Sequence, residues 1–581
     1  MKEAPGSARL PADPAPLQRY SVRKYSADLS AVGEPWLWAL GGALALGIIL
    51  VAGFLAMVFW NGATTFWPKP IEVVTLTDGS VIAGEPTRSG IYRVGENVRE
   101  TLPPDVLAAL DENDGYARRV LYRSANYDLY GDDFRWVSDY EVADVTRPAD
   151  MFLVERQEWG PFVGRIAGLV VGGEPRDMAK VSYAQLREAQ DDARERFHRI
   201  REIEQKDIGR VNYEMERERL ALRKVELREG RDSEAYRERQ AEARARIAEL
   251  EAEFARHQAR ISEIRVEDRQ DRIILEEIGG RTKEELLSDI VRLYPANDLG
   301  PMERLGVYFS RWKEFLTSEP REANTEGGVL PAIFGTVAMT LIMVVIVAPF
   351  GVITALYLRE YAKQGRIVSI VRVSVNNLAG VPSIVFGVFG LGFFAYTLGT
   401  TVDQLFYAER LPSPTFGTGG ILWAALTLAL LTVPVVIVAS EEALAAVPRS
   451  MREGSLACGA SKWQTIRRVV LPRAMPGIMT GLILAMARGA GEVAPLMLVG
   501  VVKLAPMLPV DSFYPYLHLE RSFMHLGFHI FDVGFQSRNS EAGKPMVFVT
   551  TLLLLFLIVT MNASAIYIRN RLKRKFAVGQ F

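Results

Sequence analysis

Two charged side chains interrupt an otherwise apolar stretch at residues 478–502. Arg488 and Glu492 are four residues apart, a spacing that places both on one face of a helix. A charge at the centre of a membrane helix costs about 2.5–3.5 kcal/mol on insertion scales, so such residues usually face a pathway or a partner. The planar guanidinium of Arg488 suits an oxyanion, and Glu492 would hold it in place or limit how tightly a dianion binds. The pair predicts a substrate pathway for an anion. The alternatives are a structural ion pair at a subunit interface and an arginine that reaches the lipid headgroups.

Three histidines near the end of the chain have the residue type of metal ligands. His525 and His529 have i, i+4 spacing and His518 lies nearby, but Gly527 weakens a helix there and no acidic or cysteine ligand is obviously placed. We therefore expect no metal centre. The chain has no Gly-x-x-x-x-Gly-Lys-Ser/Thr phosphate loop, and its large charged segment contains no catalytic constellation. The sequence predicts a protein that is not an enzyme and that depends on another subunit for energy.

The composition is an average over two unlike parts. The chain has 581 residues, 49% hydrophobic and 24% charged, with a formal net charge of −1 and one cysteine, Cys458. The near-neutral charge argues against a nucleic-acid-binding protein, and a single cysteine excludes an internal disulfide framework. Residues 329–358 contain no charged residue, whereas residues 184–270 contain almost no apolar run longer than two or three residues. One part is suited to a bilayer and the other to water.

Apolar runs long enough to cross a membrane occur once early in the chain and five times late in it. Crossing about 30 Å of hydrocarbon needs about 20 helical residues. The six predicted spans are residues 36–60, 329–358, 373–398, 419–439, 478–502 and 546–568. The first is predicted to be an anchor rather than a cleavable signal peptide, because the mostly polar residues 1–35 precede it and tryptophans lie at its ends.

Basic residues beside the spans predict the orientation of the chain. The C-terminal tail contains Arg569, Arg571, Lys573, Arg574 and Lys575 and no acid. Both termini are therefore predicted to face the cytoplasm, and the N-terminal segment 1–35 agrees through its basic residues Arg9, Arg19, Arg23 and Lys24. Residues 61–328 are predicted to lie on the extracytoplasmic side.

The predicted extracytoplasmic segment divides by composition. Residues 61–181 have alternating apolar stretches and turn signals, which predict a small β-rich domain. In residues 182–328, apolar side chains recur at heptad spacing in two stretches, with Glu218 and His257 at seam positions and a stop at Gly230. This pattern predicts a long antiparallel helical hairpin and a linker. A helix of about 40 residues reaches roughly 60 Å, so the hairpin is suited to contact a partner; a solvated spacer is the alternative.

The loop between the fourth and fifth spans, residues 441–475, is the most informative polar segment. Its sequence predicts a short amphipathic helix, a glycine turn and a second basic amphipathic stretch ended by proline. Trp463 and Val469 could fill a pocket in a soluble partner while Arg467 and Arg468 remain in water. A basic loop that lies on anionic lipid is the alternative.

The same loop resembles the cytoplasmic signature of the permease subunits of ATP-binding-cassette importers. That signature is Glu-Ala-Ala, three residues, Gly, nine residues, Ile, one residue, Leu-Pro, and its spacing is intact here. The matching residues are Glu453-Gly454-Ser455, Gly459, Val469 and Leu471-Pro472. The resemblance implies that the loop docks on a separate ATPase, so that ATP acts through that partner and no cofactor binds this chain directly. The residues expected to couple to the ATPase are Glu453, Gly459, Lys462, Trp463, Arg467, Leu471 and Pro472.

Two further motifs resemble the PstA-type permease of phosphate importers. They are Asn376-Asn377-Leu378-Ala379-Gly380-Val381-Pro382-Ser383-Ile384-Val385-Phe386-Gly387 and Arg488-Gly489-Ala490-Gly491-Glu492-Val493-Ala494-Pro495-Leu496. The resemblance covers about residues 329–575, the expected permease core with five of the spans. Asn376 and Asn377 are expected to hydrogen-bond between helices, and Gly380 and Pro382 to belong to a kinked, close-packed segment.

These patterns together predict a mainly α, polytopic membrane protein. The resemblance implies the type I importer permease fold with six transmembrane helices, in a bacterial inner-membrane phosphate importer. The implied partners are a second permease subunit, a dimer of ATP-binding subunits, an extracytoplasmic phosphate-binding protein and the lipid bilayer, with no nucleic acid. An importer for sulfate or molybdate, or a transmembrane sensor or tether that uses the hairpin, is the alternative. The resemblance does not extend to residues 61–328.

Overall fold

A computed structural model describes residues 35–505, 507–537 and 540–577 of the chain. It divides into two compact units, residues 1–57 and 58–581. The first contains the apolar N-terminal part of helix α1 (Pro35–Thr64). The basic residues predicted to lie in the cytoplasm, Arg9, Arg19, Arg23 and Lys24, are outside the described residues, as is the side chain of Lys575.

Six helices in the described part of the chain are long and apolar enough to cross a membrane, which confirms the predicted number of spans. They are Trp38–Thr64, Leu330–Tyr361, Ser383–Phe406, Ile421–Ala445, Lys462–Gly491 and Ser540–Arg574. The later five are built from α9 (Leu330–Leu356) with η5 (Tyr357–Tyr361), α11 (Ser383–Phe389) with η6 (Gly390–Gly399) and α12 (Thr400–Phe406), α13 (Ile421–Ala445), α15 (Lys462–Thr465) with η8 (Ile466–Val470) and α16 (Leu471–Gly491), and α19 (Ser540–Ala577).

The third span begins at Ser383, and the prediction that it covers residues 373–398 is wrong at this end. Residues before the break form a separate helix, α10 (Arg366–Leu378). Pro382 is the N-cap of α11, with φ −55° and ψ 135°. A residue that precedes proline is disfavoured in the helical conformation, so one helix does not run through Pro382.

The fifth span runs from Lys462 to Gly491, and the prediction of residues 478–502 is wrong at both ends. The basic stretch does not end at Pro472, because the helix continues from η8 across that proline into α16. At the other end α16 stops at Gly491, and a separate short helix, α17 (Ala494–Val499), begins with Pro495 in its first turn. Proline stops the helix there because it lacks an N–H and restricts the residue before it.

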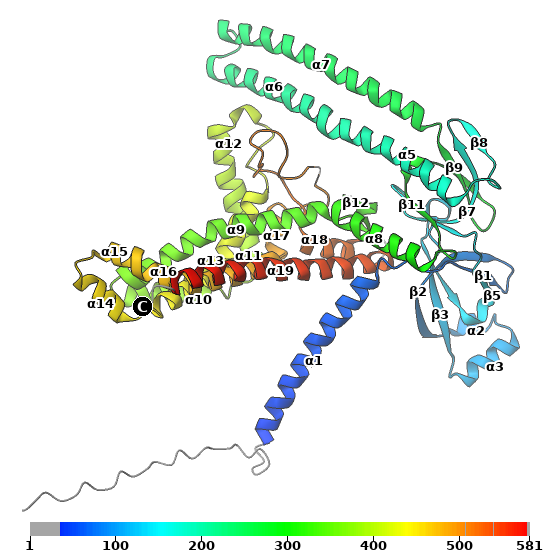
Figure 1. Ribbon diagram of the computed structural model, residues 1–581, viewed down its shortest axis with the longest axis horizontal. Coiled ribbons are helices and arrows are strands. Elements are labelled where there is room, and N and C mark those ends of the chain that lie inside the picture. Colours follow the sequence, from blue (N-terminus) through cyan, green and yellow to red (C-terminus); the bar gives the residue numbers. More distant parts are fainter. Residues whose placement is uncertain (1–34, 506, 538–539, 578–581) are drawn as a thin grey trace, which may run out of the picture. The chain divides into compact units, whose positions relative to one another are not determined.

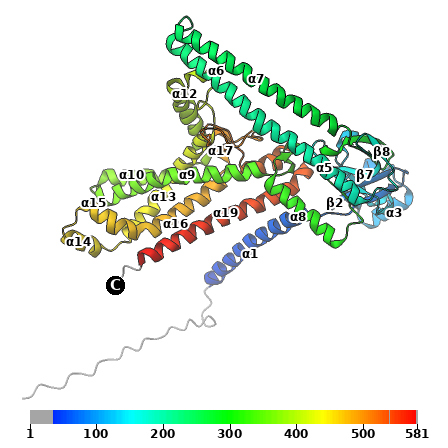
Figure 2. The same ribbon diagram turned by 45° about the horizontal axis from the view of Figure 1, so that its top comes forward.

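Helix α13 is the central helix of the membrane part, since 67% of the residues in its most apolar 18-residue stretch are buried. It packs against α9 and α16 (Figure 2). Small residues permit the close approach of α16: an added methyl on Gly477 or Gly481 would lie 2.6 or 2.5 Å from the Cβ atom of Ala443 or Ala439. The packing of these three helices therefore fixes where their ends lie.

The segment between the first and second spans contains the same five-stranded antiparallel unit twice. The first sheet has the order β4-β3-β2-β1-β5 and the second β10-β9-β7-β6-β11, which is one connectivity when the strands are counted along each unit. A 3-10 turn precedes the fifth strand in both, η1 (Asp139–Glu141) and η3 (Leu287–Asp289). The first unit contains β1 (Glu72–Leu76), β2 (Val81–Arg93), β3 (Tyr116–Arg123), β4 (Phe134–Ser138) and β5 (Val142–Thr146). The second contains β6 (Phe152–Arg156), β7 (Phe162–Val171), β9 (Arg272–Glu276), β10 (Thr282–Leu286) and β11 (Ile290–Pro295), with β8 (Glu174–Arg176) paired to the end of β7.

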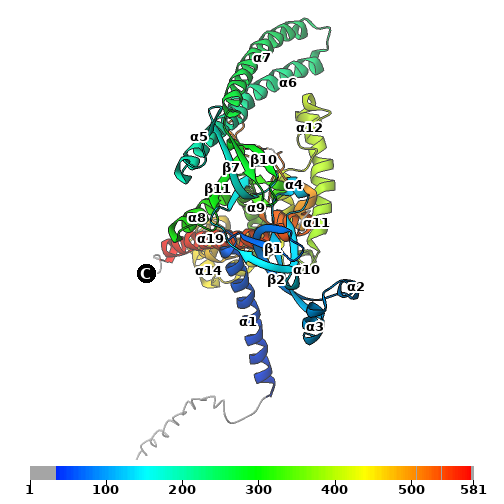
Figure 3. The same ribbon diagram turned by 90° about the vertical axis from the view of Figure 1, so that its right-hand side faces the viewer.

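Helices are inserted between the second and third strands of each unit. The first insertion is α2 (Glu96–Arg99), α3 (Pro104–Glu112), and the second is α5 (Tyr183–Glu202), η2 (Ile203–Ile208), α6 (Gly209–Glu229) and α7 (Glu234–Asp268), drawn in Figures 1 and 3. Strands β9 and β11 follow the second insertion yet pair with β7 and β6. The predicted division into a β-rich domain at 61–181 and a helical domain at 182–328 is therefore wrong. Pairing across so many residues leaves no local signal in the sequence.

Helices α6 and α7 form an antiparallel hairpin with a narrow apolar seam. Gly230 ends α6 with φ 82°, and the Ser233 side chain caps α7 by accepting a hydrogen bond from Tyr236 N. Near the base, the buried seam consists of Ile200, Ile208, Ile261 and Ile264. Farther along, Glu218 forms an ion pair with Arg239 instead of breaking the seam. Ion pairs between the helices thus supplement a seam too thin to hold them alone.

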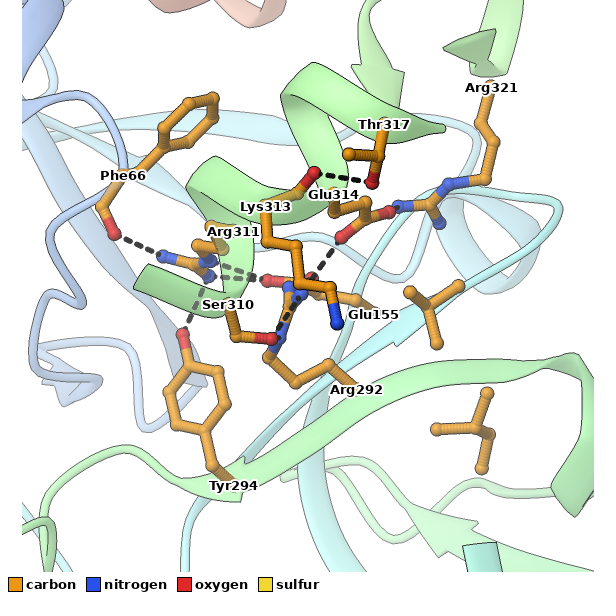
Figure 4. A network of polar contacts seen from close by, with 12 residues as sticks. Phe66, Glu155, Arg292, Tyr294, Ser310, Arg311, Lys313, Glu314, Thr317 and Arg321 are labelled. Atoms are coloured by element: carbon orange, nitrogen blue, oxygen red, sulfur yellow. Dashed lines mark hydrogen bonds and ion pairs between the residues drawn. The ribbon is translucent and has the colours of Figure 1, made fainter. Parts of the chain in front are cut away.

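A network of arginines and glutamates ties the second β-unit to helix α8 (Pro301–Thr317), as Figure 4 shows. Arg311 on α8 donates to Glu155 Oε1 at 2.7 Å and to the Tyr294 hydroxyl at 2.7 Å, and Arg292 forms an ion pair with Glu155. Burial would raise the pKa of Glu155, but the charges of the surrounding arginines outweigh it and lower that pKa to about 2. Phe315 O, near the end of α8, accepts a hydrogen bond from Val329 N just before α9. The network thereby links the β-unit to the second span.

Candidate functional site

Arg488 and Glu492 lie where helix α16 stops. Arg488 is in the last turn, and Glu492 is the first residue beyond it, with an extended backbone at φ −80° and ψ 134°. Arg488 Nε lies 3.7 Å from Glu492 Oε1, and the side chains are 35% and 23% exposed. The prediction that both lie on one face of a continuous helix is wrong, because the helix ends between them, but the pair forms across the break. At 3.7 Å the contact is an ion pair without a hydrogen bond, so the guanidinium retains donors for another group.

The break after Arg488 packs against the start of the third span. A methyl group added to Gly387 in α11 would lie 2.7 Å from Pro495 Cα and 3.0 Å from Pro495 O. The two motifs, residues 376–387 and 488–496, are far apart in the sequence and meet at this contact. Only a residue without a Cβ atom allows the two backbones to come this close. The helix break is thereby held at a fixed place beside the third span.

The structural residues proposed from the first motif are arranged differently from the prediction. Asn376 and Asn377 lie in the last turn of α10 and are exposed, and neither makes a side-chain hydrogen bond to another helix within the described residues. Gly380 is also exposed, and its N–H donates to Asn377 O at 3.0 Å. The close-packed glycine of the motif is Gly387 rather than Gly380. Pro382 serves to begin α11.

The loop at residues 441–475 contains helix α14 (Arg449–Ala457), a turn at Gly459 with φ 82°, and α15. Ser461 begins α15 with a reciprocal cap: its hydroxyl accepts from Gln464 N at 3.2 Å, and its N–H donates to Gln464 Oε1 at 2.8 Å. From Lys462 the helix continues without interruption into the fifth span. A displacement of this part of the loop is therefore a displacement of the span itself.

The residues expected to couple to an ATPase fall into two groups. The exposed members are Glu453, Gly459, Lys462, Trp463 and Arg467. The members partly buried at the start of α16 are Leu471 and Pro472. Trp463 is 54% exposed, which is high for a large aromatic side chain. An exposed tryptophan among basic residues is a surface that another protein is suited to cover.

Sequence reasoning missed the polar contacts that hold this loop in place. Arg452 pairs with Glu360 at 2.9 Å and donates to the carbonyl of Leu444 at 2.7 Å. At the end of α13, Arg372 pairs with Glu441 at 3.2 Å. The available signal was that Glu360 is the one acid among the basic residues between the second and third predicted spans. These contacts bind the loop to the ends of the second and fourth spans.

The three histidines have structural partners or apolar surroundings. The ring of His518 lies 3.0 Å from Asp511 Oδ1 and 3.1 Å from Glu520 Oε1, which are acidic partners that the sequence did not reveal. Burial lowers the pKa of His525 and of His529 to about 4. Both are therefore neutral at pH 7. Among the described residues, no group of three or more His, Cys, Asp or Glu side chains is placed to hold a metal ion.

Comparison with known proteins finds a family that the membrane part of the chain is similar to. Residues 347–574 match the family described as "Binding-protein-dependent transport system inner membrane component". The matched residues contain the loop 441–475 and both Arg488 and Glu492. The description of the family is that of a membrane component of a transport system.

Curated relatives of the permease domain include transport permeases from two bacteria. The chain is 38% identical over 205 residues to "Probable ABC transporter permease protein YqgH" of Bacillus subtilis, covering 34% of this chain and 62% of that protein. It is 43% identical over 175 residues to "Phosphate transport system permease protein PstA 1" of Mycobacterium tuberculosis, covering 30% of this chain and 52% of that protein. The chain thus spans between half and two thirds of the length of these relatives. Among solved structures, it is similar to the methionine transporter MetNI, at 18% identity and a TM-score of 0.31, over 42% of this chain and 95% of the other.

Proposed function

We propose that this chain is the permease subunit of an ATP-driven importer of inorganic phosphate and forms half of the translocation pathway. The observation that carries the proposal is the position of Arg488, which lies at a helix break in a permease domain whose relatives include phosphate transport permeases. Its guanidinium is partly exposed and is not hydrogen-bonded to Glu492 at 3.7 Å. A planar donor fork next to one carboxylate suits a phosphate that must be bound and then released.

The loop 441–475 would transmit the work of the ATPase. Trp463 and Arg467 are exposed at the start of the continuous helix that becomes the fifth span. An ATPase that covers them and moves would shift that span, and with it the break at Arg488. ATP would act only through the ATPase, with no cofactor held by this chain.

The remaining partners follow from this role. A second permease subunit would complete the pathway, two ATP-binding subunits would drive it, and an extracytoplasmic phosphate-binding protein would deliver the substrate. We place the chain in the bacterial inner membrane with both termini in the cytoplasm. The segment 61–328 and the loops before α13 and α19 would then be extracytoplasmic.

The substrate is tested by ATP hydrolysis in the reconstituted complex. With its substrate-binding subunit present, the complex is expected to hydrolyse ATP faster on addition of phosphate than on addition of sulfate or molybdate. Stimulation by sulfate or molybdate, and none by phosphate, would contradict the assignment of substrate while leaving the importer assignment intact.

The role of Arg488 is tested by Arg488→Ala, with Arg488→Lys as the matched variant. Alanine removes the donor fork and is expected to abolish phosphate uptake in vesicles at normal subunit levels. Lysine keeps the charge but not the bidentate geometry, so partial uptake is expected. Normal uptake with alanine would exclude Arg488 from the pathway.

A further inference from the structure

Helix α8 has its charged side turned inward and an apolar side turned outward. Arg311 and Glu314 point into the network with the second β-unit, as Figure 4 shows, and their side chains are only 14% and 15% exposed. Met302 and Phe309, by contrast, are 80% and 64% exposed. A helix on the surface of a soluble domain has the opposite arrangement, with its apolar stripe toward the core. The outer side of α8 is therefore suited to a medium other than water.

The exposed apolar residues of α8 form one continuous stripe along the helix. Met302, Leu305, Phe309 and Leu316 recur at spacings of three, four and seven residues, which places them on one face. These four residues are called the apolar stripe below. The exposed Lys313, four residues after Phe309, lies at its edge. A lysine in this position can lay its aliphatic stem along apolar surface while its ammonium group stays among water and headgroups.

Aromatic contacts place the middle of α8 beside the end of the first span. The Tyr308 hydroxyl donates to Ala63 O at 2.8 Å, one residue before that span ends at Thr64. The rings of Tyr308 and Trp67 lie 5.7 Å apart, and those of Trp312 and Phe66 lie 5.2 Å apart. Tryptophan and tyrosine are enriched where a bilayer meets water. The middle of α8 thus lies at the level of the membrane boundary.

The last turn of α8 lies at the start of the second span. Val329 N donates to Phe315 O at 2.8 Å, and Leu330 N, at the first residue of that span, donates to Ser318 O at 3.2 Å. Phe315 is buried in a cluster with residues of α9 and α19. The end of the first span and the start of the second lie on the same side of the membrane, because the two spans are consecutive. Since two points of α8 are held at span ends on that side, the helix runs along the boundary rather than away from it.

We propose that α8 lies in the boundary between lipid headgroups and acyl chains, with the apolar stripe inserted among the acyl chains. The bilayer is the occupant because α8 is joined to the ends of two spans and is flanked there by tryptophan and tyrosine. A helix of this kind buries its apolar face roughly 5–10 Å into that boundary. Its opposite face holds the second β-unit through Arg311 and Glu314. The helix would thereby fix the height of the β-unit over the membrane, a role that goes beyond transport of any substrate.

A fluorescent label on a single cysteine tests the contact with lipid. The native Cys458 is replaced by serine, and an environment-sensitive dye is attached at Phe309→Cys or, as the matched control, at Val266→Cys. Val266 is also an apolar helical residue and is 60% exposed, but it belongs to α7 of the hairpin. The full chain, with the subunits that purify with it, is reconstituted in vesicles of phosphatidylethanolamine and phosphatidylglycerol. A fraction of the lipid carries a nitroxide quencher on the acyl chain close to the glycerol.

The nitroxide lipid is expected to quench the dye at position 309 about fivefold more strongly than the dye at position 266. Quenching at 309 should weaken when the nitroxide is moved to the end of the acyl chain, because the helix lies at the boundary and not at the bilayer centre. Equal quenching at the two positions would overturn the proposal. A dye at 309 that is shielded from water but not quenched by lipid would overturn it as well, by showing that a second copy or another subunit covers the stripe.

A measurement on the unchanged protein excludes a disturbance of α8 by the label. The wild type is reconstituted with a phospholipid that carries a photoactivatable group close to the glycerol, and the crosslinked peptides are identified by mass spectrometry. Lipid adducts are expected on residues 301–317 and on the spans, with none on the α7 peptide that contains Val266. Adducts on the spans without any on α8 would contradict the proposal. Neither measurement depends on transport, so the lipid contact and the assignment of substrate can fail separately.

Discussion

Replacing Gly387 with alanine tests whether the two permease motifs meet as described. The added methyl would lie 2.7 Å from Pro495 Cα, whereas ordinary contact begins at 3.4 Å, so α11 and α17 would have to separate by roughly 0.7 Å. The group that is met is backbone and has no rotamer through which to yield. Overpacking of this kind costs about 1–3 kcal/mol, and the better helix propensity of alanine recovers up to about 1 kcal/mol. We expect a net destabilisation of about 1–2 kcal/mol.

The matched control is Gly392→Ala in the same span. A methyl group there meets nothing within 4 Å, so this variant is expected to be neutral or slightly more stable than the wild type. The assay is the apparent melting temperature of the purified protein in detergent, followed by phosphate uptake in vesicles. For a domain of about 150–250 residues 1 kcal/mol corresponds to about 2–4 °C, so Gly387→Ala should melt about 2–8 °C lower. Uptake should fall with it, because the break at Arg488 loses its support.

Equal melting temperatures for Gly387→Ala, Gly392→Ala and the wild type would refute the contact between α11 and α17. The placement of Arg488 beside the third span would then be wrong as well, since the two positions depend on the same packing. A lower melting temperature with unchanged uptake would refute only the link between this packing and transport.

Three further predictions concern the second β-unit and the loop 441–475. Glu155→Gln leaves the surrounding arginines without their carboxylate and should lower the melting temperature. Because the pKa of Glu155 is lowered to about 2, the stability that its charge contributes to the wild type should be complete above pH 4.5 and should be lost as the pH falls toward 2. The melting temperature of the variant should lack this dependence on pH. Burial, then Glu285 and Asp268, raise the pKa of Asp289 from 3.8 to about 6. Ionisation of Asp289 therefore lowers the stability of the folded protein as the pH rises from about 4 to 6. Asp289→Asn removes the charge and should stabilise the protein above pH 6 by about 1–2 kcal/mol after allowance for solvent screening. The measurement is the melting temperature of both proteins as a function of pH. Trp463→Ala should leave the melting temperature nearly unchanged, because the side chain is 54% exposed, yet reduce coupled uptake at least tenfold; normal uptake would remove Trp463 from the coupling surface.

The spans could be predicted from the sequence because length and apolar composition are local properties. The ends of helices inside apolar runs were harder to predict, because the hydropathy does not change where α16 ends at Gly491 or where α11 begins at Ser383. Pro382 and Pro495 were the available signals. For the candidate site, residue types indicated Arg488 and Glu492 correctly as a pair, although the backbone between them is not the helix that their spacing suggested.

The repeated β-unit could not be predicted from local patterns. Its second copy is interrupted by the hairpin, so β9 finds its partner β7 only after α5, α6 and α7 have been passed. A faint signal exists: Pro148-Ala149 and Pro295-Ala296 come at or just after the fifth strands of the two units. The contact between Tyr213 and the segment at Phe513 could not be predicted either, because the hydrogen bond there joins residues 301 apart in the chain.

Helix α13 gives the separate parts of this chain a common physical connection. Its first N–H groups are capped by the loop that carries Phe513, and its last turns carry Glu441, which pairs with Arg372 ahead of the loop 441–475. A helix of this length extends about 38 Å, and it is buried against α9 and α16 on both sides of an internal proline, Pro434. The two ends of the membrane part are therefore connected through one packed helix, in which Pro434 is the place where a bend would occur. A hairpin that contacts the loop at the start of α13 is for this reason connected to the loop 441–475 at the other end of the helix.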